Sequence, residues 1–167
     1  GLIASDPILK SMLADDAPHD VTPFVNEKLR QIAISVGASE VYVMDPNGLT
    51  VAASNYRDED SFLGRNFSYR PYFTDALLGR SAVFHALGTT SGERGFFFSA
   101  PVLDGIEVVG VLAVKMTVGP LERDWLSAGR EILIADANGI VFLSTRPDYL
   151  FKALAPLSGD VRRRIED

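Results

Sequence analysis

The sequence predicts an α+β fold in which a long N-terminal helix precedes an antiparallel five-stranded sheet. Over residues 1–36, apolar side chains recur at intervals of three and four, the spacing of one helix face. The period then changes to two in five later segments, as in strands. One helical stretch separates the second segment from the third. Three strands in succession then favour antiparallel pairing, with the connections on one face of the sheet.

The N-terminal arm is expected to contain two helix starts. Asp6 before Pro7 is a favourable first start, and Asp20 is a second one after a break near Pro18. The apolar stripe of the second part consists of Val21, Phe24, Val25, Leu29, Ile32 and Ala33. This stripe can pack on the chain's own sheet or, through Val21, Phe24, Val25 and Ile32, form a weak homodimer, and the sequence favours neither.

The five predicted strands are separated by turns rich in glycine, asparagine and proline. They cover residues 41–45, 50–54, 82–87, 95–102 and 106–118. Pro71 and Gly79 bracket the helix between the second and third strands, because proline is favoured at the first helical position and glycine just past the end. This order is the outline of a PAS-like domain. A further helix is predicted over residues 119–129.

An internal repeat predicts a second, abbreviated PAS-like unit. Residues 40–55 and 131–146 align without a gap, and each contains a strand, an Asp-x-Asn-Gly turn and another strand. Such turns are common in hairpins, but the match extends along both flanking strands. Few residues follow the second copy. The predicted organisation is a helical arm over 1–36, a ligand-binding PAS-like domain over 37–118, and a linker helix with a partial second domain over 119–167.

Composition excludes several classes of function. The net charge of −6 and the pI near 4.9 argue against nucleic-acid binding, and the absence of cysteine removes disulfides and thiolate sites. His19 and His85 have no partner at ligand spacing, so we expect no metal. The sequence contains no phosphate-binding loop, dinucleotide motif or Ser-His-acid pattern. We therefore expect no cofactor and no catalytic residue in this chain.

A cation is predicted at the start of the short helix. Arg70 precedes a proline, which holds it in extended geometry as the N-cap. The N–H groups of Tyr72 and Phe73, in the first turn, have no partner within the helix. The guanidinium and the positive helix end together favour a carboxylate or a phosphate. Taken alone, Arg70 is better explained by an ion pair with an acid of residues 58–60.

A second cation is expected on the fifth strand. Alternation over residues 106–118 places Lys115 beside Ala113 on a face that is otherwise apolar. A strand that is apolar on both sides is covered on both sides, and a buried ammonium group needs a partner. The alternative is a lysine whose side chain reaches solvent at the strand end.

A hydroxyl-rich loop precedes the fourth strand. Thr89, Thr90 and Ser91 lie between Gly88 and Gly92. In an isolated loop such hydroxyls usually bond the local backbone. Because this strand end belongs to the same sheet as the predicted lysine, the hydroxyls are also candidates to complete the hydrogen bonds of a carboxylate.

Three segments resemble a known family of sensors. They are "GRNFSYRPYF" (64–73), "ALGTTSGERGFFFSAPV" (86–102) and "VVGVLAVKMTVGPLERDW" (108–125). They are similar to the extracytoplasmic region of four-carbon dicarboxylate sensor histidine kinases of the DctB type, and the resemblance extends over nearly the whole chain. It implies a periplasmic double Cache domain, anchored by membrane helices outside these residues, that binds succinate, malate or fumarate and signals to a kinase by helix displacement.

The resemblance also implies the residues of the ligand site. These are Arg70, Tyr72, Thr89, Thr90, Ser91, Gly92 and Lys115. One position departs from the family's pattern, which has a tyrosine just ahead of the arginine whose hydroxyl assists the carboxylate. Here Phe67 stands three residues before Arg70 and Tyr69 immediately before it. If Phe67 takes the place of that hydroxyl, a change in affinity or ligand choice is expected.

Other functions stay open at this point. A Cache domain of a chemoreceptor would bind another small carboxylate or an amino acid. An amine ligand would need a carboxylate facing the arginine, and the nearest acids in sequence, Asp104 and Glu107, lie in the turn and at the strand start. An enzyme using Lys115 as a nucleophile would need a second catalytic group, and the sequence shows none. A ligand-free structural module would use Arg70 and Lys115 only for internal ion pairs.

Overall fold

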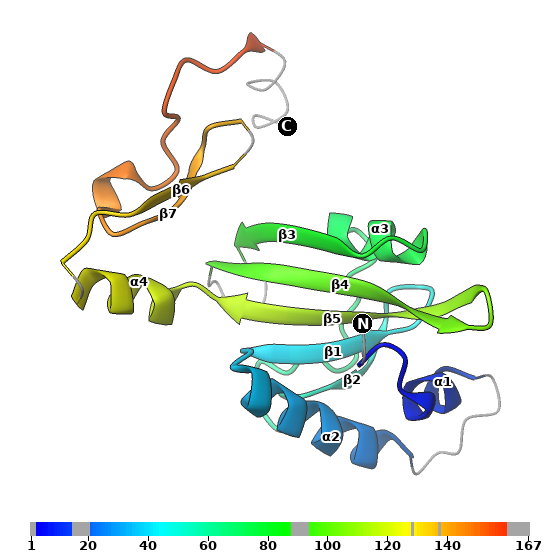
Figure 1. Ribbon diagram of the computed structural model, residues 1–167. Helices are drawn as coiled ribbons and strands as arrows, with labels where there is room; N and C mark the ends of the chain where they lie inside the picture. The colour runs from blue at the N-terminus through cyan, green and yellow to red at the C-terminus, as the bar shows by residue number, and fades with distance from the viewer. Residues whose placement is uncertain (1–2, 15–20, 88–93, 128, 137, 160–167) are drawn as a thin grey trace. The chain divides into compact units, whose positions relative to one another are not determined.

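The computed structural model describes residues 3–14, 21–87, 94–127, 129–136 and 138–159, drawn in colour in Figure 1. The chain divides into two compact units, Gly1–Thr117 and Val118–Asp167. The candidate residues Thr89, Thr90, Ser91 and Gly92 lie outside the described residues.

The first unit contains an antiparallel sheet of five strands in the order β2-β1-β5-β4-β3. The strands are β1 (Glu40–Met44), β2 (Thr50–Ala53), β3 (Ala82–Leu87), β4 (Arg94–Asp104) and β5 (Glu107–Thr117), and the helices are α1 (Pro7–Leu13), α2 (Val21–Val36) and α3 (Pro71–Leu77). The second unit contains α4 (Gly119–Ser127), the two-stranded sheet β6 (Leu133–Ala135) and β7 (Val141–Ser144), and the 3₁₀ helix η1 (Pro147–Tyr149). The predicted fold class is confirmed.

The N-terminal arm forms two helices. Asp6 caps α1 as predicted, because its side chain accepts a hydrogen bond from the Ile8 N–H at 3.1 Å and Pro7 occupies the first position. The side chain of Asn26 attaches α2 to the sheet by accepting the Ala53 N–H at 2.8 Å. Among the described residues, no helix is long and apolar enough to span a bilayer.

The apolar stripe of α2 packs on the chain's own sheet, which is the first of the two possibilities given above. Val25, Leu29 and Ala33 are buried in a core with the alternate residues of the strands, and Val21 and Ile32 pack against it. Phe24 is different, because 60% of its surface is exposed. The stripe therefore stabilises the first unit, and Phe24 is the most exposed of the four residues named for a homodimer.

A second core covers the opposite face of the sheet. Neighbouring residues of β1 show the division, because Val41 and Val43 belong to the first core and Tyr42 and Met44 to the second. Helix α3 and the segment between β2 and α3 supply the cover, including the rings of four aromatic residues, Phe62, Phe67, Tyr72 and Phe73. Alternation along β1 and β5 thus gives the sheet two different buried faces.

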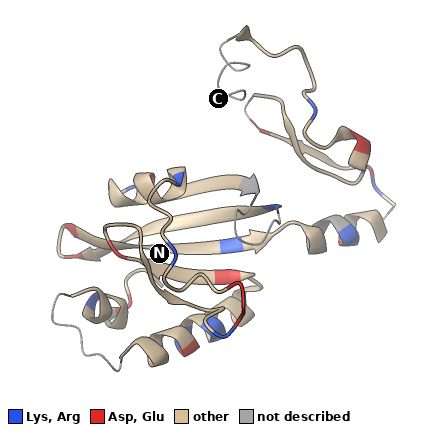
Figure 2. Ribbon diagram, turned by 180° about the vertical axis from the view of Figure 1, so that it is seen from behind, with Lys and Arg blue, Asp and Glu red and all other residues tan. Residues whose placement is uncertain are grey.

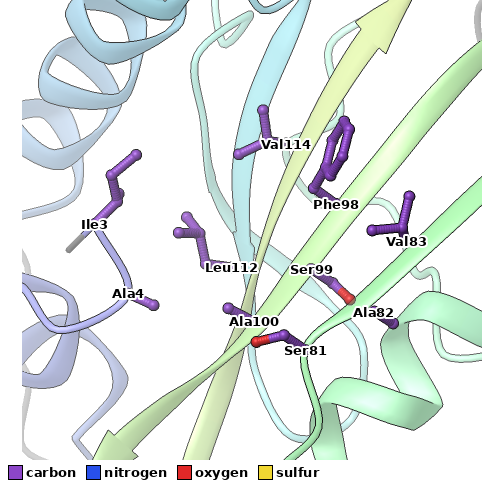
Figure 3. A pocket seen from close by; sticks show the side chains of 10 residues that line it. All are labelled: Ile3, Ala4, Ser81, Ala82, Val83, Phe98, Ser99, Ala100, Leu112 and Val114. Carbon is purple, nitrogen blue, oxygen red and sulfur yellow. The ribbon is translucent and has the colours of Figure 1, made fainter. Parts of the chain in front are cut away.

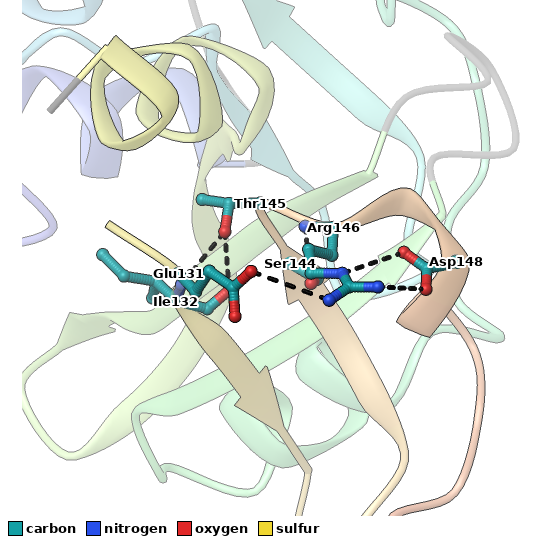
Figure 4. Close-up of polar contacts among 6 residues, drawn as sticks. All are labelled: Glu131, Ile132, Ser144, Thr145, Arg146 and Asp148. Atoms are coloured by element: carbon teal, nitrogen blue, oxygen red, sulfur yellow. Dashed lines mark hydrogen bonds and ion pairs between the residues drawn. The ribbon is translucent and has the colours of Figure 1, made fainter. Parts of the chain in front are cut away.

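The repeat seen in the sequence is repeated in the backbone hydrogen bonds. The Val41 carbonyl accepts the Ser54 N–H at 2.8 Å, and the Ser54 hydroxyl accepts the Val41 N–H at 2.9 Å. At the equivalent positions, the Thr145 hydroxyl accepts the Ile132 N–H at 3.0 Å, as Figure 4 shows. Both hairpins also shift register at the same place, after Val43 in the first and after Ile134 in the second. The β6–β7 hairpin of the second unit is a shorter version of the β1–β2 hairpin of the first.

The turn of each hairpin is closed by an aspartate. The Asp45 carboxylate accepts the N–H groups of Asn47 and Leu49, and Asp136 does the same for Asn138 and Ile140, all at 2.8 to 2.9 Å. The glycine of each turn has a positive φ, +81° and +78°. The Asp-x-Asn-Gly motif therefore has the same structural role in both units.

The first turn holds the segment that leads to Arg70. The Gly48 carbonyl accepts the Phe67 N–H at 2.9 Å, and the Asn66 amide donates to the Asn47 carbonyl at 2.9 Å. A Cβ at Gly48 would lie 2.6 Å from the backbone of Ser68. Glycine is thus required both for the turn's φ and for this close approach.

The contribution of the close approach can be measured with two glycines. Gly48→Ala should lower the free energy of unfolding by about 3 kcal/mol, because strain in φ and steric overlap add. Gly64→Ala is the matched control, since Gly64 has φ +77° but nothing within 4 Å of its Cβ position, and it should lose only about 1 kcal/mol. Urea denaturation of both variants tests this, and equal losses would show that the approach to Ser68 contributes nothing.

Candidate functional site

The candidate site lies on the face of the sheet that α3 covers. Lys115 is on the central strand β5, directly opposite Glu40 of β1 on one side and Phe97 of β4 on the other. Tyr42 follows Glu40 by two residues and therefore points to the same face. The register of three strands thus brings an acid, a base and two aromatic rings together.

Lys115 is completely buried, with an exposed fraction of 0%. Its Nζ lies 3.1 Å from Glu40 Oε2 and 5.7 Å from the centroid of the Phe62 ring. Its stem passes Gly95, where a Cβ would lie 3.4 Å from Lys115 Cγ. The alternative in which the lysine reaches solvent is therefore wrong, and the expected burial is observed.

Glu40 is the acid that sequence reasoning missed. Asp104 and Glu107 are the acids nearest in sequence to the strand that carries Lys115, but they face each other at the far end of the β4–β5 pair. Glu40 is the first residue of β1, and only the pairing of β1 with β5 places it beside the lysine. Alternation indicates that it shares a face with Tyr42, but sequence alone does not supply the partner strand.

Arg70 is the N-cap of α3, as predicted. Its backbone is extended (φ −80°, ψ 133°), and its carbonyl accepts the N–H groups of Phe73 and Thr74. The side chain is half-buried and lies over the Tyr69 ring, 5.2 Å from the centroid. Among the described residues it forms no ion pair with the acids at 58–60, so the simpler explanation offered for this arginine is not supported.

Two buried tyrosines lie close to Arg70. The hydroxyls of Tyr42 and Tyr72 are 2.8 Å apart, and the Tyr72 ring stacks on Phe97 with centroids 5.2 Å apart. Burial raises the pKa of Tyr72 to about 12 and raises the pKa of Tyr42 well above its ordinary value. The nearby charge of Arg70 acts in the opposite direction on the pKa of both. Both hydroxyls are therefore neutral hydrogen-bond donors at physiological pH.

Phe67, three residues before Arg70, belongs to the aromatic cluster on this face. Its ring is buried between Tyr42 and Phe62, with centroids 5.7 Å and 5.4 Å away. The ring contributes packing and no polar group. Among the described residues, hydroxyls on this face are supplied by Tyr42, Tyr72 and Ser99.

Of the residues that the structure describes, three charged side chains belong to this face: Arg70, Lys115 and Glu40. In Figure 2 a basic segment of β5 lies beside an acidic segment of β1, in agreement with the Lys115–Glu40 ion pair. Arg70 acts on Tyr42 from the helix side and Glu40 from the strand side, because the charges of both affect the pKa of that buried tyrosine. The arrangement is suited to binding a small anion.

A separate hollow of about 330 Å³ lies against β3, β4 and β5 beside the N-terminal segment (Figure 3). The residues lining it are Ile3, Ala4, Ser81, Ala82, Val83, Phe98, Ser99, Ala100, Leu112 and Val114. None of these residues is charged, so this hollow does not match the chemistry of an anion site.

Comparison with curated proteins gives two sensors. A protein of Pseudomonas aeruginosa described as the C4-dicarboxylate transport sensor protein DctB is 40% identical over 159 residues, 95% of this chain. The protein of the same description from Rhizobium meliloti is 31% identical over 160 residues, also 95% of the chain. The chain spans 26% and 25% of these relatives, about a quarter of their length. No family model matches the chain.

Solved structures agree with this result. The sensor domain of the V. cholerae histidine kinase DctB has a TM-score of 0.86 at 34% identity, covering 98% of this chain and 64% of that one. The ligand-binding domain of the P. aeruginosa amino-acid chemoreceptor PctC, solved with GABA, has a TM-score of 0.65 at 24% identity, covering 91% and 72%. The second likeness is one of fold alone.

The fold and these similarities define the class, which is that of PAS-like Cache sensor domains. Within that class the chain belongs to the DctB family of sensor proteins. The resemblance noted in the sequence is therefore confirmed.

The raised pKa of Tyr72 predicts a dependence of stability on pH. The folded state keeps a proton that the unfolded chain releases near pH 10, so the contribution is full below pH 10 and is lost as pH rises toward about 12. Tyr72→Phe should reduce this alkaline loss of unfolding free energy by about 2 kcal/mol. Denaturation curves at several pH values measure it, with the neutral-pH difference subtracted to remove the effect of the lost hydrogen bond. Parallel curves for both proteins would contradict the assignment.

Proposed function

We propose that this chain is the extracytoplasmic ligand-sensing part of a two-component sensor histidine kinase and that it binds a four-carbon dicarboxylate of the succinate, malate or fumarate class. The observation that carries the proposal is the fully buried Lys115 on the same face as Arg70, in a chain of the DctB family. The proposed ligand residues are Arg70, Tyr72, Lys115 and, outside the described residues, Thr89, Thr90, Ser91 and Gly92.

The two cations are suited to different ends of a dicarboxylate. Arg70 presents a planar fork that can clamp one carboxylate through two bonds, whereas Lys115 is a point charge that can meet the other. The buried Tyr72 hydroxyl, close to the guanidinium, can donate to the carboxylate held there. Monocarboxylates satisfy only one of these groups, which supports a dianion as the ligand.

The remaining parts of the proposal concern the whole protein. Membrane helices outside these residues would anchor it with this domain in the periplasm, and helix displacement would carry the signal to the kinase. The boundaries 1–36, 37–118 and 119–167 are retained as the proposed functional division. A weak homodimer also stays a prediction, with Phe24 as its exposed apolar contact.

An amino-acid ligand is the second candidate, and one observation favours it. Glu40 supplies the acid that an ammonium group would need, and it faces the same site as Lys115. Against this, the carboxylate is already paired with the lysine at 3.1 Å. The relatives at 40% and 31% identity are named for C4-dicarboxylates, and the amino-acid chemoreceptor shares only the fold.

Substitution of the two cations tests the dicarboxylate proposal. Arg70→Ala and Lys115→Met should each weaken succinate binding by about one to two powers of ten, since a charge-assisted bond contributes roughly 1.5 to 3 kcal/mol. Methionine is used because it keeps the volume of the buried lysine stem. Isothermal titration with succinate, glutarate and butyrate measures the effect, after circular dichroism has shown that each variant folds.

Arg80→Ala is the control for loss of a positive charge. Arg80 follows α3 and pairs on the surface with Asp75, so the variant should bind succinate like the wild type. When the cation that butyrate does not touch is replaced, the affinity for butyrate should fall much less than the affinity for succinate. Unchanged succinate affinity in Lys115→Met would make the lysine structural and remove the main support for a dicarboxylate.

The second unit should bind no dicarboxylate. Its hairpin matches the first, but the acid equivalent to Glu40, Glu131, is 80% exposed and pairs with Arg146 at 3.6 Å (Figure 4). Arg146 also pairs with Asp148, so its charge is already met by two acids at the surface. Calorimetry should therefore give one succinate per chain, and two equivalent sites would contradict this prediction.

A further inference from the structure

Glu40 has no assigned role in ligand binding, yet it is the acid that pairs with the buried lysine. This inference rests on the proposed function, because it concerns how a dicarboxylate would reach Lys115. The Glu40 side chain is 13% exposed, whereas that of Lys115 is fully buried. The ammonium group therefore has a built-in carboxylate partner before any ligand is considered.

The geometry makes this pair part of the binding face. Glu40 and Lys115 are direct cross-strand partners on β1 and β5. Tyr42, two residues along β1, connects the pair to the helix side of the site through its hydroxyl contact with Tyr72. The charges of Glu40 and Arg70 both influence Tyr42, in opposite directions. Glu40 is thus within electrostatic range of the space that the ligand would occupy.

Among the described residues, the charged side chains of this face are those of Arg70, Lys115 and Glu40, and their formal charges sum to +1. Binding of a dianion would change this sum to −1. The second carboxylate of the ligand would meet the Lys115 ammonium group, which is already paired with the Glu40 carboxylate. Like charges brought close together in a partly buried site repel strongly. A ligand with a single carboxylate on Arg70 would not meet this repulsion.

We propose that Glu40 sets the charge selectivity of the site by competing with the ligand's second carboxylate for Lys115. In the empty site it is the counter-ion that makes burial of the ammonium group tolerable. In the occupied site it opposes the dianion and so holds the affinity below what Arg70 and Lys115 alone would give. Glu40 is therefore a specificity-determining residue that acts through Lys115.

Glu40→Gln, made in the full chain of 167 residues, tests the proposal. Succinate should bind roughly tenfold to a hundredfold more tightly, because glutamine keeps the shape and removes the competing charge. Butyrate should change by less than about threefold, since its apolar end faces the lysine. The ratio of the two affinities, from isothermal titration, is the quantity that decides.

Thermal unfolding supplies an independent readout. Without ligand, Glu40→Gln should melt at a lower temperature than the wild type, because the buried ammonium group loses its counter-ion. With succinate at a fixed concentration, the stabilisation by ligand should be larger than in the wild type. A residue that only stabilises the fold would lower the melting temperature without enlarging the ligand effect.

Glu107→Gln is the matched control. It removes the same charge from the same sheet, but Glu107 lies eight positions from Lys115 along β5, roughly 26 Å away, and should leave both affinities unchanged. Glu40→Asp is the second variant, for use if Glu40→Gln does not fold. It keeps the charge but draws it back from Nζ, so a smaller gain for succinate is expected.

The outcomes separate this proposal from the proposed function. Succinate binding that is equal or weaker in Glu40→Gln, or no gain in Glu40→Asp where that variant is used, would overturn the role of Glu40. An equal gain for butyrate would overturn it as well, because the effect would then be one of general charge. Failure of the wild type and every variant to bind any dicarboxylate would instead refute the proposed function.

Discussion

The burial of one ammonium group constrains everything that packs on the α3 side of the sheet. The side chain of a lysine on a central strand does not reach solvent here, so its ammonium group needs an acidic or polar partner on a neighbouring element. The pairing of β1 with β5 supplies Glu40 for this purpose. The absence of a side chain at Gly95 leaves room for the lysine stem, and the Phe62 ring covers the ammonium group. Residues on three different strands and a loop thus accommodate the one buried ammonium group of Lys115.

The same sheet has a different character on its other face. There, α1 and α2 cover aliphatic residues, and the polar contact that ties helix to strand is a neutral amide, Asn26, bonded to the β2 backbone. Alternation along the strands therefore gives the two buried faces different compositions. One core is largely aliphatic, whereas the other is rich in aromatic rings and lies beside the Lys115–Glu40 ion pair.

Much of this organisation could be predicted from the sequence. Alternation over β5 placed Lys115 on a covered face, and the proline after Arg70 located the start of α3, because both follow from local geometry. The repeat was visible because the turn chemistry of Asp45 and Asp136 depends on residues close in sequence. Glu40 could not be predicted as the partner of Lys115, since 75 positions separate them in the chain and only strand order and register bring them together. The Tyr42–Tyr72 contact was missed for the same reason.

The attachment of α3 to β4 has a mechanical consequence. The Tyr72 carbonyl accepts the Ser99 hydroxyl at 2.8 Å, and the ring of the same tyrosine lies flat on Phe97. A displacement of the first turn of α3 would therefore also displace β4, because these two contacts join the helix to the strand without an intervening loop. Strand β4 is hydrogen-bonded to β5 along nearly its whole length, and β5 ends at Thr117, two residues before α4 begins. The first turn of α3 is thus connected to the end of β5 at Thr117 through contacts with β4 and the β4–β5 hydrogen bonds.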